Sequence, residues 1–199
     1  MAQKPMHQNA LSMIVRSRIR HLNPGCFALV MATGIVSIDV SQHGMTLLAQ
    51  ALFGLNLLAY AVLLVMTTLR LLHFPRELLA DFVSPGRGAG FLTLAAGTCV
   101  LGSQCLLVVP LPRLADGLLL AGALSWVGLV YLFLAATITA RIKPGFTRSI
   151  NGGWLVAVVA TQALAVLLVL RTASVVPPNV AWLFTALCLY LLGAALWML

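Results

Sequence analysis

The sequence predicts an all-α membrane protein with six transmembrane helices, and three observations support this fold class. First, 61% of the 199 residues are hydrophobic and 8% are charged, whereas soluble domains carry about 25% charged residues. Second, the mean hydropathy is +1.04. Third, six segments lack Asp, Glu, Lys, Arg and His, and each is close to or longer than the roughly 20 residues that cross a bilayer. These segments are 22–38, 44–69, 88–112, 117–140, 149–170 and 172–199.

The basic residues predict the orientation of these spans. Of the 12 lysines and arginines, all but Arg113 and Arg171 precede the first span or lie in the loops after the second and fourth spans. Cytoplasmic loops are enriched in Lys and Arg, so we expect a multi-pass inner-membrane protein with both termini in the cytoplasm. This bias accounts for most of the net charge of +8. The lipid bilayer is therefore the expected partner, and nucleic acid is not.

Residues 1–21 form a basic segment ahead of the first span. Apolar residues 11–15 are followed by Arg16, Arg18 and Arg20, a pattern that suits a short helix lying on an anionic leaflet. A disordered basic tail fits the pattern equally well. No A-x-A-like cleavage site follows the apolar run, which argues against a secretory signal. We expect a single transmembrane domain over 22–199.

The first, third and fifth spans share a repeated pattern. Each opens with a glycine one or two positions before an aromatic residue, and these aromatics, Phe27, Phe91 and Trp154, lie 64 and then 63 positions apart. Six and seven residues after each aromatic comes a pair of small or hydroxyl residues. Repeats of this kind indicate tandem units, so we predict three helical hairpins at about 22–72, 86–140 and 149–199. A chance similarity between apolar segments is the alternative.

The odd-numbered spans also carry small and polar residues along one face. Such a face can pack helices closely or line a narrow hydrated passage, and its recurrence on three spans favours the passage. We therefore predict that the odd helices are inner helices on the pore side. The even helices are predicted to be outer helices that face lipid, as in the leucine-rich run 55–64. The predicted lining residues are Thr33, Gly34, Ser37, Gly97, Thr98, Gln104 and Thr161.

Electrostatics predicts that such a passage favours anions. In the expected orientation all three inner helices begin at the cytoplasmic side, and each helix start carries about half a positive charge. The neighbouring arginines add a positive potential that concentrates anions. Asp39, the acidic residue nearest to a span interior, sits at the outer end of the first span and is interpreted as a solvated end-cap.

The spans lack the residues that other membrane functions need. The four histidines lie in the tail, at boundaries or in loops, which argues against a haem b protein. The serines of the spans have no buried histidine partner, and Glu77 and Asp81 lie in the loop after the second span, so an intramembrane hydrolase is not expected. The four cysteines match no metal-site spacing. We expect no enzymatic activity, no cofactor and no metal.

Residues 19–38 resemble the opening of the tellurite-resistance/dicarboxylate transporter family. Members of that family often begin with a Pro, an aromatic residue and then Met-x-Thr-Gly, and this chain has Pro24, Phe27 and the run Met31-Ala32-Thr33-Gly34. The segment 151–155, Asn-Gly-Gly-Trp-Leu, resembles the entry to a later inner helix. The family includes bacterial tellurite-resistance channels, the yeast malate transporter and plant guard-cell slow anion channels. The resemblance implies five tandem hairpins, with the odd helices forming a pore in each subunit of a trimer.

The resemblance further implies a transporter or channel for small anions, such as a C4-dicarboxylate or tellurite. Five units of about 64 residues would need about 320 residues, and this chain has 199, so we expect a truncated or partial member with the first three hairpins. The family's pore-occluding phenylalanine lies on the ninth helix, so no residue here is expected to take that role. The alternative is a non-conducting structural membrane protein or a degenerate fragment of the family.

Overall fold

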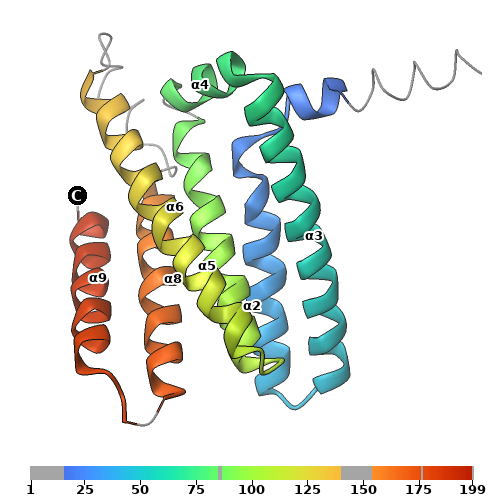
Figure 1. Cartoon of the computed structure of the whole chain (residues 1–199), viewed down its shortest axis with the longest axis vertical. Coiled ribbons are helices and arrows are strands. Elements are labelled where there is room, and N and C mark those ends of the chain that lie inside the picture. Colours follow the sequence, from blue (N-terminus) through green and yellow to red (C-terminus); the bar gives the residue numbers. More distant parts are fainter. Residues whose placement is uncertain (1–15, 85–86, 140–153, 176, 199) are drawn as a thin grey trace, which may run out of the picture.

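The computed structural model describes residues 16–84, 87–139, 154–175 and 177–198. Within them, six long helices form one bundle (Figure 1). All six are long and apolar enough to cross a membrane, so the predicted all-α fold with six spans is confirmed. The helices are α2 (Ala28–Gln42), α3 (Thr46–His73), α5 (Leu92–Leu107), α6 (Pro112–Thr139), α8 (Trp154–Ala173) and α9 (Val180–Met198), and 3-10 turns precede α2 (η1, Pro24–Phe27) and α5 (η2, Gly88–Phe91).

Helix α5 lies at the centre of the bundle. Consecutive helices contact each other as the pairs α2–α3, α5–α6 and α8–α9, and α5 also contacts both α2 and α8. The central span buries 72% of its residues, against 11% in α3 and α9. Small residues permit this close approach. A Cβ at Gly102 would lie 2.7 Å from Cδ2 of Leu167 on α8, and one at Gly122 would lie 2.6 Å from Sγ of Cys99. The assignment of inner and outer helices stays a prediction.

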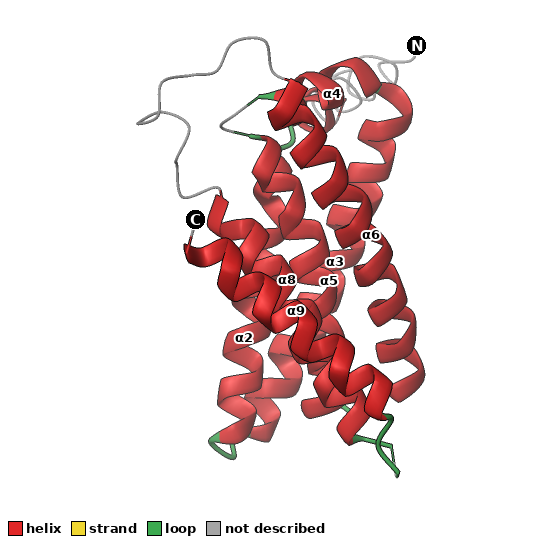
Figure 2. Ribbon diagram, turned by 90° about the vertical axis from the view of Figure 1, so that its left-hand side faces the viewer, coloured by secondary structure: helices red, strands yellow, loops and turns green. Residues whose placement is uncertain are grey.

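A short helix, α4 (Pro75–Val83), lies across one end of the bundle in both views (Figures 1 and 2). We call this end the α4 end. Glu77 and Asp81 were expected in a loop, but both lie in this helix. Proline at the first helical position and an acidic residue in the first turn both favour a helix start, and Pro75 and Glu77 supply them.

Several predicted span boundaries differ from the helix ends: α2 ends at Gln42 rather than at 38, α3 ends at His73 rather than at 69, and α6 begins at Pro112 rather than at 117. At two further boundaries the difference is explained by prolines. The sixth span was expected from residue 172, but α8 continues to Ala173 and α9 begins at Val180. Pro177 and Pro178 lie between the two helices, where proline interrupts helical hydrogen bonding. Asn179 then caps α9, because its Oδ1 accepts from the backbone N–H of Ala181 at 3.0 Å. The third span ends at Leu107 rather than at 112, shortly before the prolines at 110 and 112.

Part of the predicted cytoplasmic surface lies outside the described residues. Residues 16–20 are helical. The rest of the basic segment 1–21, apart from position 21, is not described, and neither is the loop with Arg141, Lys143 and Arg148. The segment 151–153 that carries part of the family resemblance is not described either.

Candidate functional site

Six of the seven predicted lining residues are buried within the bundle. The seventh, Thr33, is half-buried. The seven residues belong to three helices and do not all meet at one place in the bundle. The structure brings Gly34 and Gln104 together, and it places Thr161 at a different helix contact. The predicted residues are Thr33, Gly34 and Ser37 on α2, Gly97, Thr98 and Gln104 on α5, and Thr161 on α8.

Gly34 lies where α2, α3 and α5 meet, which we call the central junction. A Cβ at this position would lie 2.5 Å from Val100 Cγ1, 3.1 Å from Asn56 Nδ2 and 3.2 Å from Gln104 Oε1. The absent side chain thus allows α2 to approach two polar side chains directly. Farther along α2, the Ser37 hydroxyl donates to the carbonyl oxygen of Ala49 on α3 at 2.9 Å. At the central junction, α2 therefore packs directly against α3 and α5 through backbone and polar contacts.

A carboxamide pair forms the polar core of the central junction. Asn56 Nδ2 donates to Gln104 Oε1 at 2.6 Å, and both residues are fully buried. The remaining atoms, Asn56 Oδ1 and Gln104 Nε2, have no hydrogen-bond partner among the described residues. Burying such atoms unpaired costs about 1–3 kcal/mol each. The pair is therefore held in place at a cost to stability.

Asn56 was not among the predicted residues, because its helix was expected to be a leucine-rich span that faces lipid. The neighbouring leucines Leu55 and Leu58 are indeed exposed. A signal was present, however, because a polar residue within a span is costly in lipid and normally faces the protein interior. Tyr60, one turn away, follows the same rule.

Tyr60 extends the polar contacts from Asn56 toward the α4 end. Its hydroxyl lies 3.0 Å from Thr98 Oγ1. Since the Thr98 hydroxyl donates to the Leu94 carbonyl oxygen at 2.7 Å, the Tyr60 hydroxyl donates to Thr98. The Phe27 ring packs edge-on against Tyr60, with 5.9 Å between ring centroids. A Cβ at Gly97 would lie 3.3 Å from the Phe27 carbonyl oxygen.

Thr161 belongs to the contact between α6 and α8. Its hydroxyl accepts from Trp126 Nε1 at 2.9 Å and donates to the Ala157 carbonyl oxygen at 2.8 Å. Both hydrogen-bonding roles of this hydroxyl are thus used within the bundle.

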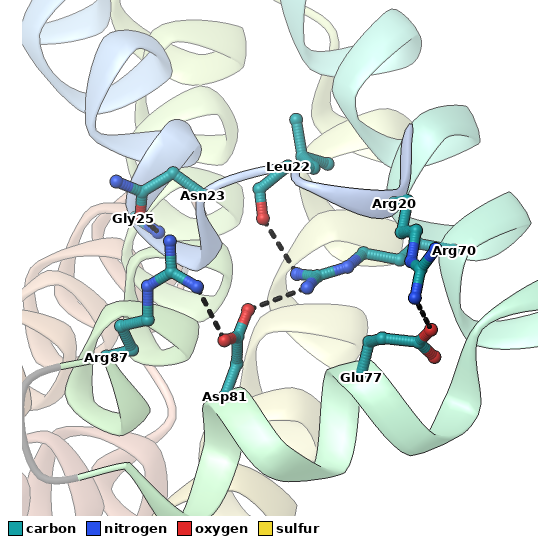
Figure 3. A network of polar contacts seen from close by, with 8 residues as sticks. All are labelled: Arg20, Leu22, Asn23, Gly25, Arg70, Glu77, Asp81 and Arg87. Carbon is teal, nitrogen blue, oxygen red and sulfur yellow. Dashed lines mark hydrogen bonds and ion pairs between the residues drawn. The ribbon is translucent and has the colours of Figure 1, made fainter. Parts of the chain in front are cut away.

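The α4 end carries a buried ionic cluster, shown in Figure 3. Arg70 donates to Asp81 Oδ2 at 2.6 Å and to the Leu22 carbonyl oxygen at 2.7 Å. Arg87 donates to the other carboxylate oxygen of Asp81 at 2.7 Å. Burial alone would raise the pKa of Asp81, but the hydrogen bonds and charges of the two arginines outweigh it and hold this pKa below its ordinary value. Two guanidinium groups on one carboxylate leave a net positive charge.

A small cavity of about 20 Å³ adjoins this cluster. This volume is enough for about one water molecule. Arg70, whose Nε has no hydrogen-bond partner among the described residues, contributes to the cavity wall. The lining residues are Leu22, Asn23, Pro24, Phe27, Thr67, Arg70, Leu78, Phe91 and Leu94.

The two ends of the bundle differ in charge. Helices α2, α5 and α8 all begin at the α4 end (Figure 1), and so direct the positive ends of their dipoles there. At the opposite end, Arg171 donates through Nη2 to Asp116 Oδ2 at 3.0 Å and through Nε to Oδ1. Among the described residues, the α4 end carries Arg16, Arg18, Arg20, Arg70, Arg76 and Arg87 with Glu77 and Asp81, and the opposite end carries Arg113 and Arg171 with Asp39 and Asp116.

Comparisons with known proteins indicate a transport role for relatives of this chain. Residues 21–199 match the family model described as voltage-dependent anion channel. An uncharacterized transporter of Methanocaldococcus jannaschii is 34% identical over 91 residues, which cover 43% of this chain and 26% of that protein. The match therefore spans about a quarter of that relative. No solved structure matches the chain significantly. Among the described residues, no cluster of three His, Cys, Asp or Glu side chains is suited to hold a metal ion.

Proposed function

The chain belongs to the voltage-dependent anion channel family, and from this membership we propose that it transports small anions across a membrane. The observation that carries the proposal is the charge difference between the two ends of the bundle. The α4 end combines three helix starts with an excess of arginines, and such a surface raises the local concentration of anions. The opposite end has as many aspartates as arginines among its described residues.

We propose that the chain spans an inner membrane and that its α4 end faces the cytoplasm. This orientation follows the distribution of Lys and Arg between the loops. It puts both termini inside, with residues 22–199 as one transmembrane domain after the basic segment 1–21. The proposed cargo is a small anion such as a C4-dicarboxylate or tellurite, and the proposed assembly is a trimer. Both of these follow from the family resemblance of residues 19–38.

The proposed path runs along the inner helices α2, α5 and α8, with the seven predicted lining residues beside it. In this chain all of those residues except Thr33 are buried, and Gly34 and Gln104 meet at the central junction. The closed contacts also favour a second candidate, a non-conducting member of the family.

Flux measurements separate the two candidates. The purified full chain is reconstituted into liposomes, and efflux of chloride, nitrate, succinate and tellurite is compared with that from protein-free liposomes. Anion transport predicts efflux of at least one of these anions above the protein-free rate. Efflux equal to that of protein-free liposomes for all four would contradict transport by this chain and favour the non-conducting member.

A further inference from the structure

The carboxamide pair Asn56–Gln104 is half-satisfied although it is fully buried. Each carboxamide offers an N–H₂ group and a carbonyl oxygen, and the single bond between them uses Nδ2 of Asn56 and Oε1 of Gln104. The large majority of buried polar side-chain atoms in folded proteins have a partner. Here Gln104 Nε2 and Asn56 Oδ1 have none among the described residues. The pair therefore has one N–H₂ group and one carbonyl oxygen that are available to bind a ligand.

The number of unpaired groups does not depend on how the two amides are oriented. Turning both carboxamides by 180° exchanges nitrogen and oxygen, and the pair again forms one N–H···O bond. One N–H₂ group and one carbonyl oxygen then remain, as before. Turning only one amide places two donors or two acceptors face to face. Every arrangement that preserves the bond thus leaves one free N–H₂ group, which is that of Gln104 in the structure and that of Asn56 when both amides are turned.

The free donor suits an anion better than a cation. Hard cations take several oxygen ligands, and the pair has one free oxygen. The charge at the α4 end also favours anions over cations. Amide N–H groups are neutral donors, which bind an anion weakly enough for it to leave again, as passage requires.

The pair is connected to the basic end by one face of α3. Asn56, Tyr60, Thr67 and Arg70 follow helical spacing on this face. Tyr60 contacts Thr98 of α5, Thr67 lines the small cavity, and Arg70 belongs to the ionic cluster. This row of polar side chains leads from the arginines to the buried pair.

We propose that Gln104 and Asn56 form a binding site for the transported anion at the central junction. The Gln104 N–H₂ group donates to the anion, and Asn56 is a positioning residue that holds the Gln104 carboxamide. Gly34 lets α2 lie directly against the pair, because a Cβ at this position would be only 3.1 Å from Asn56 Nδ2 and 3.2 Å from Gln104 Oε1. Since both amides are fully buried, the ion reaches them when α2 moves away from α3 and α5 at Gly34. This inference rests on the proposed function.

Nuclear magnetic resonance tests binding directly. The full chain, ¹⁵N-labelled and in lipid nanodiscs, is titrated with chloride, nitrate and succinate at constant ionic strength maintained with gluconate. The Gln104 side-chain signal is identified by its loss in Gln104→Leu. We expect this signal to shift saturably with at least one anion. The matched control is Gln162 on α8, whose Nε2 already donates to the Tyr190 carbonyl oxygen at 3.2 Å and whose signal should not shift. The Asn56 side-chain signal is identified in the same way by its loss in Asn56→Leu, and unchanged signals of both Gln104 and Asn56, or an equal shift at Gln162, overturn the proposal.

Liposome efflux tests the role of the site in transport. Gln104→Leu and Asn56→Leu should each lower anion efflux about tenfold, the effect of losing roughly one hydrogen bond, whereas Gln162→Leu should leave efflux unchanged. Gln104→Met, which keeps the length of the side chain, serves if the leucine variant does not fold. Gln104→Leu leaves Asn56 Nδ2 without its acceptor, so the unfolding temperature of this single variant should fall, whereas the double variant Asn56→Leu/Gln104→Leu removes both carboxamides and should be close to wild type in stability. Unchanged efflux in the folded Gln104 variants overturns the proposal.

The two experiments distinguish failure of the binding site from failure of the proposed function. A saturable Gln104 shift without efflux from the wild-type chain contradicts transport by this chain but supports the binding site. Efflux without a shift contradicts the binding site and leaves the proposed function standing.

Discussion

Arg70 of α3 and Asp81 of α4 form an ion pair in which the guanidinium Nη2 lies 2.6 Å from the carboxylate Oδ2. Only 4% of the Arg70 side chain and 12% of the Asp81 side chain are exposed. Through the same guanidinium, Arg70 also binds the backbone at Leu22, just before the first span. This one side chain therefore connects α4, the end of α3 and the entry to α2.

Removing the carboxylate should destabilise the fold strongly. Asp81→Asn leaves the buried Arg70 charge uncompensated, and breaking a buried pair in this way costs about 3–5 kcal/mol. The free energy of unfolding, measured by denaturant titration in detergent, reports this loss. Glu77→Gln is the matched control, because the Arg20–Glu77 pair is 52% and 36% exposed and such pairs contribute less than about 1 kcal/mol. Equal losses in both variants would contradict the assigned role.

The same aspartate predicts a pH dependence of stability. Its pKa in the folded chain is held below the ordinary value by Arg70 and Arg87, against the effect of burial. A depressed folded pKa contributes stability that is fully present above the unfolded pKa of about 3.9 and is lost as the pH falls through the folded pKa. Unfolding temperatures of the wild type and Asp81→Asn should therefore differ at neutral pH and converge in acid. A constant difference down to the lowest accessible pH would refute this.

Gly34 should tolerate no side chain. In Gly34→Ala the new methyl group would lie 2.5 Å from Val100 Cγ1, and overpacking of this kind costs about 1–3 kcal/mol. Gly54 of α3 has no atom within 4 Å of a Cβ at its position. Gly54→Ala should instead be neutral or stabilise by up to about 1 kcal/mol through helix propensity. Thermal unfolding of the two variants gives the comparison, and a Gly34→Ala variant as stable as wild type would show that the central junction is looser than described.

The proposed orientation predicts which end of the bundle an impermeant reagent reaches. In a background without native cysteines, His43→Cys at the opposite end should react with a membrane-impermeant maleimide in intact cells. Arg76→Cys at the α4 end should react only after the membrane is opened. Both positions are exposed in the structure, so access differs by membrane side alone. The reverse pattern would place the α4 end outside.

The six spans could be predicted from the sequence because crossing lipid imposes a simple requirement, a long segment without charges. The errors arose where that requirement does not apply. Helix α4 mixes charges with leucines over nine residues, so its composition resembles that of a polar loop. The sixth span was predicted to begin too early because residues 172–199 carry no charge. The helix begins only at Val180, after Pro177 and Pro178.

The site was predicted less completely, since it depends on which faces of the helices meet. Gln104 was selected for its place on a helix rich in small residues, and it is buried as a polar residue in such a span should be. Its partner Asn56 lies on α3, which was predicted to face lipid because it is rich in leucine. Only the approach of α3 to α5 shows that one face of this leucine-rich helix turns inward. Thr161 follows the same pattern as Thr98 in the sequence, yet its hydroxyl binds Trp126 of α6.

The pairing of Arg171 with Asp116 has a consequence for any ionic current through the protein. At that end the described arginines and aspartates balance, whereas arginines predominate at the α4 end. An anion driven from the α4 end starts from an enriched local pool, and one driven the other way does not. The current–voltage relation for an anion path should therefore be rectified, with the larger current when anions move away from the α4 end, and raising the salt concentration should straighten it by screening the arginines.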